Sequence, residues 1–103
     1  MKTREILFKH AKRRAVERYE FEIDQNTFEN FNHRIMEYSK NRIANGILFL
    51  KKESNRLVHY LIDDIYIVVF CKQRKAITTF LPPDAIHNYL TGSKYFENRK
   101  KWK

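Results

Sequence analysis

The sequence contains very little cysteine, glycine and proline, and each shortage excludes a class of protein. Its 103 residues include one cysteine, two glycines and two prolines. The single cysteine, Cys71, excludes an internal disulfide framework and a cysteine-based zinc site within one chain, and it fits a reducing, cytoplasmic setting. Two isolated glycines exclude a glycine-rich phosphate loop. We therefore expect a compact domain without long flexible loops.

Long apolar runs and acidic residues are also scarce. No stretch is long enough to cross a membrane, and the charged N-terminus lacks the apolar core of a signal peptide. The 21 Lys and Arg residues outnumber the 12 Asp and Glu residues, which gives a formal charge of +9. Such an excess favours RNA or another nucleic acid as partner, although it also fits a charge that serves only solubility. We expect no membrane partner.

The residues that are abundant are apolar and aromatic, at 43% and 15% of the chain, which suffices for one packed domain. Helical spacing predicts helices over residues 4–19 and from Asn26 or Thr27 to about Asn45-Gly46. A period of two then predicts four strands, at 47–50, 57–62, 65–71 and 76–81. Asp84 is predicted to cap a short helix over 85–90.

These elements predict a single α+β domain over residues 1–93. Two N-terminal helices pack on a four-stranded antiparallel meander sheet, because connections this short join antiparallel neighbours. A short C-terminal helix follows the sheet. Residues 94–103 form a basic, aromatic C-terminal tail.

The strongest candidate for function is the row His10, Arg14 and Arg18 on the first helix, where spacing of four residues places all three on one face. Both arginines fall beside an apolar stripe. That stripe consists of Leu7, Phe8, Ala11, Ala15 and Tyr19. Helices keep arginine out of such a sector unless it has a partner or a task. The row is therefore either a phosphate site or a structural feature, in which an arginine pairs with a carbonyl or with Asp63 or Asp64 and His10 is a surface residue.

His10, Arg14 and Thr79 together have the chemistry that metal-independent RNA cleavage needs. Histidine transfers protons near neutral pH, arginine stabilises the added charge of the transition state, and threonine donates a hydrogen bond to phosphate. Thr79 is equally an ordinary strand residue by propensity. We expect no cofactor and no metal, since the four histidines are widely spaced and Asp63-Asp64 alone does not form a two-metal site.

Further residues are predicted to contact nucleic acid. His59 is a polar residue flanked by Leu57 and Leu61 on one face of a strand, which calls for an explanation. The tail alternates aromatic and basic residues, a pattern that suits stacking on bases as well as a disordered terminus. The predicted contacts are Arg13, Arg18, His59, Arg99, Lys100, Lys101 and Trp102.

The run His10-Ala11-x-x-Arg14-x-x-Glu17-Arg18 resembles the opening helix of small bacterial and phage domains. These domains resemble the barnase, EndoU, colicin and RelE superfold of ribonucleases and toxins, and the segment from Ile77 to Pro82 is similar to their late strand. The resemblance spans about residues 8–83. It implies helices packed on a four-stranded antiparallel sheet and a metal-independent endoribonuclease, with His10, Arg14 and Thr79 as its catalytic residues and Arg18 in support.

Three functions fit these observations. The first is a cytoplasmic RNA-cleaving domain of toxin or phage origin, which uses 2′-hydroxyl attack on phosphate and has a protein antitoxin as further partner. The second is a non-catalytic, phage-type inhibitor or accessory protein that binds nucleic acid or a host nucleoprotein. The third is a purely protein-binding module, in which the charge is incidental.

Overall fold

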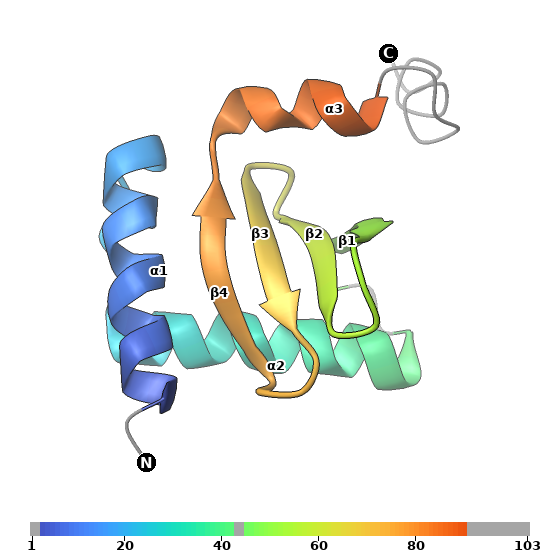
Figure 1. Ribbon diagram of the computed structural model, residues 1–103, viewed down its shortest axis with the longest axis horizontal. Coiled ribbons are helices and arrows are strands. Elements are labelled where there is room, and N and C mark those ends of the chain that lie inside the picture. The colour runs from blue at the N-terminus through green and yellow to red at the C-terminus, as the bar shows by residue number, and fades with distance from the viewer. Residues whose placement is uncertain (1–2, 43–44, 91–103) are drawn as a thin grey trace.

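The computed structural model describes residues 3–42 and 45–90. The elements, in chain order, are α1 (Thr3–Tyr19), α2 (Gln25–Asn41), β1 (Ile47–Lys52), β2 (Leu57–Ile62), β3 (Tyr66–Cys71), β4 (Ala76–Leu81), a 3₁₀ turn η1 (Pro83–Ala85) and α3 (Ile86–Leu90). The strands form one antiparallel sheet in the order β1-β2-β3-β4 (Figure 1). The predicted α+β arrangement, two helices followed by a meander sheet, is confirmed.

The predicted strand ends need two corrections. The first strand continues to Lys52, two residues further than predicted. The third strand starts after Ile65, because Ile65 lies in a tight turn and its N–H donates to the carbonyl of Ile62 at 3.0 Å. Asp63 and Asp64 make this turn with positive φ angles of 55° and 61°. Two successive left-handed residues match the twist of a hairpin.

The predicted helix caps also need correction. Asp24, and not Asn26 or Thr27, caps α2, since its carboxylate accepts the N–H of Thr27 at 2.8 Å. Asp84 does not cap a helix. It lies inside η1, which follows Pro82 without a side-chain cap.

The two faces of the sheet differ in what covers them. The back face packs against α1 and α2 in the main core, which includes Ala11, Phe28, Ile35, Val58, Tyr60, Val68, Phe70 and Phe80. We call the opposite face, with His59, Leu61, Ile67, Val69 and Thr79, the front face. Figure 1 views the sheet from this side, with α2 behind it. Only α3 packs on the front face among the described helices, through Ile86 and Tyr89 against Leu61 and Ile67.

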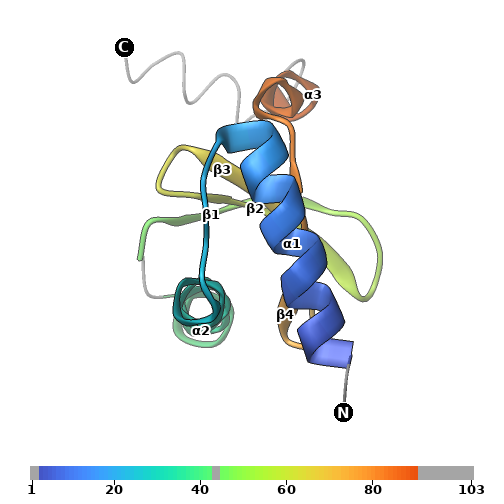
Figure 2. The same cartoon turned by 90° about the vertical axis from the view of Figure 1, so that its left-hand side faces the viewer.

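Helix α1 lies along the edge strand β4 and is fixed to it at both ends. Arg4 donates to the carbonyls of Arg74 and Lys75, just before β4, at 3.0 and 3.2 Å. Arg18 donates to the carbonyl of Phe80, near the end of β4, at 2.7 Å. The helix and the strand therefore run in the same direction, and Figure 2 shows α1 passing in front of β4.

Candidate functional site

The strand register aligns four residues in a row across the front face. Thr79 on β4 pairs with Val69 on β3, Val69 pairs with His59 on β2, and His59 pairs with Lys51 on β1. Neighbouring strands are about 4.8 Å apart, so the backbones of Thr79 and His59 are about 10 Å apart. Thr79, His59 and Lys51 therefore lie on one face of the sheet, with only Val69 between Thr79 and His59.

The predicted residues His10 and Arg14 belong to α1, the helix that runs alongside β4 at one end of this row. Because Arg4 and Arg18 are held near the two ends of β4, the residues midway between them on α1 lie alongside the middle of that strand. That part of β4 includes Thr79. The structure thus places His10 and Arg14 on the helix that neighbours the strand of Thr79, and no described hydrogen bond or ion pair joins either residue to Thr79. His10 is exposed, and the side chain of Arg14 is 34% exposed.

The two arginines of the row have different partners. Arg14 forms an ion pair with Glu17 at 2.8 Å, one helical turn away on the surface. Exposed pairs of this kind contribute little, so a phosphate can displace Glu17. Arg18 is bound to the carbonyl of Phe80, which explains why it lies beside the apolar stripe. Of the predicted carboxylate partners, Asp63 pairs instead with Arg34, at 2.6 Å.

His59 lies at the other end of the row, in a cluster of hydrogen-bonding side chains. It is 9% exposed, and both ring nitrogens are occupied: Nδ1 lies 2.5 Å from the Tyr89 hydroxyl and Nε2 lies 2.6 Å from the Glu53 carboxylate. The group that this cluster presents to solvent is the Glu53 carboxylate, whose side chain is 47% exposed.

The two ring nitrogens of His59 bind Tyr89 and Glu53. Burial, assisted by the charge of Glu53, raises the pKa of Tyr89 to about 12. The hydroxyl therefore keeps its proton at neutral pH. Because a carboxylate only accepts hydrogen bonds, Nε2 of His59 donates to Glu53. The chain from Tyr89 through His59 orients the carboxylate of Glu53.

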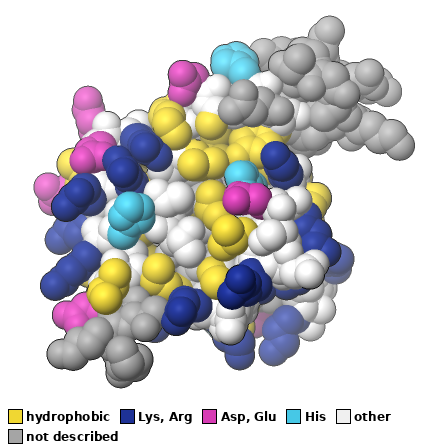
Figure 3. All heavy atoms as spheres, in the orientation of Figure 1, with side chains coloured by type: hydrophobic (Ala, Val, Ile, Leu, Met, Phe, Trp, Pro, Cys, Tyr) yellow, Lys and Arg dark blue, Asp and Glu magenta, His cyan; other side chains and the backbone are white. Residues whose placement is uncertain are grey.

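A cavity of about 440 Å³ adjoins this cluster, and Lys51, His59, Tyr89 and Asp84 are among the residues that line it. Figure 3 shows hydrophobic side chains in the middle of the front face and Lys and Arg side chains gathered on both sides of it. Cations therefore flank an apolar surface on this face.

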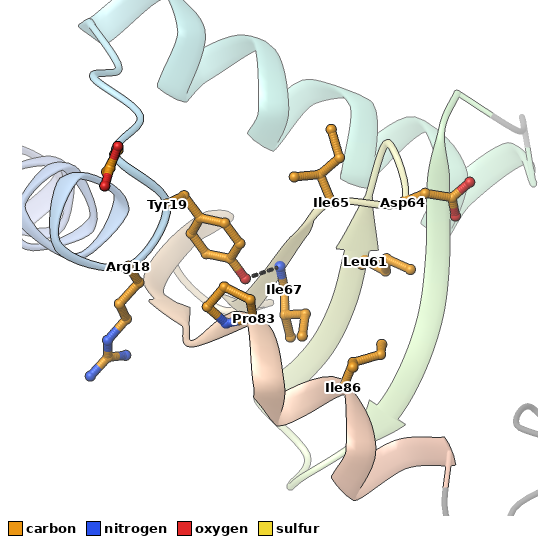
Figure 4. A pocket seen from close by; sticks show the side chains of 9 residues that line it. Arg18, Tyr19, Leu61, Asp64, Ile65, Ile67, Pro83 and Ile86 are labelled. Atoms are coloured by element: carbon orange, nitrogen blue, oxygen red, sulfur yellow. Dashed lines mark hydrogen bonds between the residues drawn. The ribbon is translucent and has the colours of Figure 1, made fainter.

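A larger cavity, of about 580 Å³, lies between the end of α1, the β2–β3 turn and α3. Its lining is mainly apolar, with Leu61, Ile67 and Ile86. Figure 4 shows the charged ends of Arg18 and Asp64 pointing to opposite sides, away from these residues. Polar groups do not converge in this cavity, so the candidate chemistry belongs to the row across the front face.

Sequence reasoning missed Lys51, Glu53 and Tyr89. Pairing the predicted strands 47–50 and 57–62 as a hairpin would have placed Lys51 and Glu53 near His59. The contact with Tyr89 comes from α3 and has no local sequence pattern. Arg13 is exposed on α1. The predicted tail residues Arg99, Lys100, Lys101 and Trp102 lie outside the described residues.

The described residues contain neither a cluster of metal-binding side chains nor a membrane-spanning helix. Within residues 3–42 and 45–90, no three His, Cys, Asp or Glu side chains gather closely enough to hold a metal ion. In the same ranges, no helix combines the length and apolar character needed to cross a membrane.

Comparison with known proteins finds no protein family that matches this chain, no curated protein similar to it and no solved structure that matches it. The resemblance to the ribonuclease and toxin superfold therefore stays a prediction.

Proposed function

We propose that this protein is a metal-independent endoribonuclease-like domain of toxin or phage origin that holds RNA on the front face of its sheet. The observation that carries the proposal is the presence of two groups with acid–base chemistry on either side of Val69. Thr79 lies on the β4 side, and α1, which contains His10 and Arg14, runs along that strand. Glu53, oriented by His59, lies on the other side. A cytoplasmic location belongs to this proposal, because RNA is the substrate and the single cysteine is buried and free.

The proposed reaction is an attack of the RNA 2′-hydroxyl on the adjacent phosphorus. Glu53 accepts the 2′-hydroxyl proton as the new P–O bond forms, and the bond from phosphorus to the 5′-oxygen breaks. His10, as the general acid, gives a proton to that 5′-oxygen. The products are a 2′,3′-cyclic phosphate and a 5′-hydroxyl, so the protons and bonds balance without a metal.

Three other side chains support this reaction. Arg14, released from its surface pair with Glu17, and Lys51 stabilise the added negative charge of the pentacoordinate transition state. The hydroxyl of Thr79 donates a hydrogen bond to a phosphate oxygen. In the free protein this hydroxyl makes only a long contact, 3.4 Å, with the carbonyl of Phe80, and it can turn towards a ligand.

The test is incubation of end-labelled RNA with the protein in EDTA. We expect cleavage with cyclic-phosphate ends, and no cleavage of the same RNA when it carries 2′-deoxy nucleotides. His10→Ala and Glu53→Gln should each lower the rate about 100-fold or more. His33→Ala, which removes an exposed histidine on α2, is the matched control and should leave the rate unchanged. Intact RNA, or cleavage that EDTA abolishes, would overturn the proposal.

The occupied nitrogens of His59 favour one alternative, a non-catalytic protein that binds nucleic acid or a nucleoprotein. In that case the cluster of His59, Glu53 and Tyr89 only fixes α3 to the sheet. RNA would be retained uncut, with an affinity that falls steeply as salt rises. His10→Ala would then change binding and reveal no cleavage.

A further inference from the structure

A second candidate surface lies on the other side of the sheet, beside the C-terminal end of α2. Two adjoining cavities, of about 310 and 210 Å³, share Ser39 and Lys72 in their linings. We call this combined surface the basic groove. It does not include any residue of the row across the front face.

Positive charge lines the basic groove. The cations that contribute to it are Lys40, Arg42, Lys52, Lys72 and Lys75. All five are exposed, and none forms an ion pair with a carboxylate in the described part of the chain. No acidic residue lines either cavity among the described residues. Unpaired cations gathered on one surface attract a polyanion.

Aromatic rings form the apolar part of the basic groove. Phe49 is 44% exposed, which is unusual for a ring of this size. It meets Tyr60 edge to face at 6.3 Å, and Tyr60 meets Tyr38 in the same way at 6.1 Å. Arg42 lies over the ring of Tyr38, 5.6 Å from its centre. The contacts hold Phe49 and Arg42 in place before any ligand arrives.

We infer that the basic groove binds single-stranded nucleic acid. One unstacked base lies against Phe49, and the neighbouring phosphates contact Arg42, Lys52 and Lys72. An exposed ring amid cations suits this ligand, because every base offers a π-face and every phosphate a charge. A duplex keeps its bases stacked and cannot offer one to Phe49. This inference does not rest on RNA cleavage.

The groove and the front face are joined at the sheet edge. Lys51 and Lys52 are neighbours on β1, which is an edge strand, and they point to opposite faces. Lys52 lines the basic groove and Lys51 lines the cavity beside His59. A single-stranded nucleic acid that leaves the basic groove and passes around β1 therefore reaches the front face after a short path.

Fluorescence anisotropy with a labelled oligo(dT) of eight nucleotides tests the inference, because this probe has no 2′-hydroxyl and resists the proposed cleavage. We expect binding, which Phe49→Ala and Phe49→Leu each weaken about tenfold. Leucine keeps the apolar contact with Tyr60 and lacks a stacking face, so it separates stacking from packing. Ile65→Ala is the matched control, since Ile65 is also large and exposed and lies outside the groove.

The charge contribution is tested with Lys52→Gln combined with Lys72→Gln. Loss of two phosphate contacts should reduce the slope of log affinity against log salt by about 1.4. Lys9→Gln with Lys12→Gln makes the same charge change on α1 and should leave the slope unaltered. Absence of oligo(dT) binding at low salt, equal binding of duplex DNA, or wild-type affinity in both Phe49 variants would overturn the inference. None of these outcomes decides whether the front face cleaves RNA.

Discussion

The Tyr89 hydroxyl and His59 Nδ1 lie 2.5 Å apart, and this contact ties α3 to the front face of the sheet. The two rings also meet edge to face, with centres 5.6 Å apart. Because His59 is buried, loss of the hydroxyl leaves Nδ1 without its hydrogen-bond partner. We expect Tyr89→Phe to lower the free energy of unfolding by about 1–3 kcal/mol, measured by urea denaturation.

The matched control for Tyr89→Phe is Tyr66→Phe. The Tyr66 ring also packs in a core, and its hydroxyl has no hydrogen bond to another described residue. This change should be almost neutral. If the two variants were equally stable, the contact between Tyr89 and His59 would contribute nothing measurable.

Tyr89 also predicts a dependence of stability on alkaline pH. Burial raises its pKa from 10.0 to about 12, so the folded protein holds this proton more tightly than the unfolded chain. The resulting stabilisation is complete below pH 10 and is lost as the pH rises through about 12. The stability of the wild type should therefore approach that of Tyr89→Phe over this range. Unfolding curves at several pH values, with absorbance of tyrosinate as a second measure, would check it.

Tyr19 joins the ends of β3 and β4. Its hydroxyl donates to the carbonyl of Leu81 at 2.7 Å and accepts the N–H of Ile67 at 3.0 Å (Figure 4). Tyr19→Phe removes both bonds at once, so we expect a loss of about 2 kcal/mol. Amide hydrogen exchange of Ile67 should also become faster. Unchanged protection at Ile67 would contradict this assignment.

The sequence predicts those elements whose pattern is strictly local. The bounds of β2 and β4 agree with the alternation of apolar residues, and the turn at Asp63-Asp64 agrees with its residue types. The front-face row is harder to predict, because the register shifts between Phe49 and Lys51 and again between Val69 and Phe70. One extra residue in a strand moves every following side chain of that strand to the opposite face of the sheet.

The second register shift decides the position of Thr79. Ile77 pairs with Phe70 and lies in the main core, whereas Thr79 pairs with Val69 on the front face. Strict alternation would put both residues on one face, and the unpaired residue between them, Thr78, prevents this. Because no local sequence pattern marks this bulge, the sequence predicts Thr79 as a candidate but does not predict which face of the sheet it occupies.

Arg4 and Glu29 predict an acid-dependent contribution to stability. The guanidinium binds the carboxylate through two contacts, at 2.6 and 2.8 Å, and so connects α1 with α2. These hydrogen bonds hold the pKa of Glu29 below its usual range. The stabilisation is therefore complete above the unfolded pKa and is lost as the pH falls through the lowered value. Since both side chains are partly exposed, Glu29→Gln should cost about 1 kcal/mol at pH 7.

The comparison for Glu29 is Glu17→Gln, which removes the surface pair with Arg14 and should cost less than about 0.5 kcal/mol. The difference between wild type and Glu29→Gln should shrink as the pH is lowered from 7 to about 3. A difference that stays constant over this range would show that the charge of Glu29 is not its source.

Gly46 precedes β1 with a φ of 75°, where only glycine is free of strain. Its carbonyl accepts the N–H of Asp63 at 2.7 Å, and a Cβ at this position would press against the Asp63 carboxylate and the Arg34 guanidinium. Gly46→Ala should therefore destabilise the protein by about 1–3 kcal/mol through both backbone strain and collision. A double-mutant cycle with Asp63→Ala isolates the collision with Asp63, since it removes that carboxylate and leaves the backbone strain and the contact with Arg34. We expect Gly46→Ala to cost clearly less in the Asp63→Ala background, and equal costs in both backgrounds would show that the Asp63 carboxylate contributes nothing to the effect.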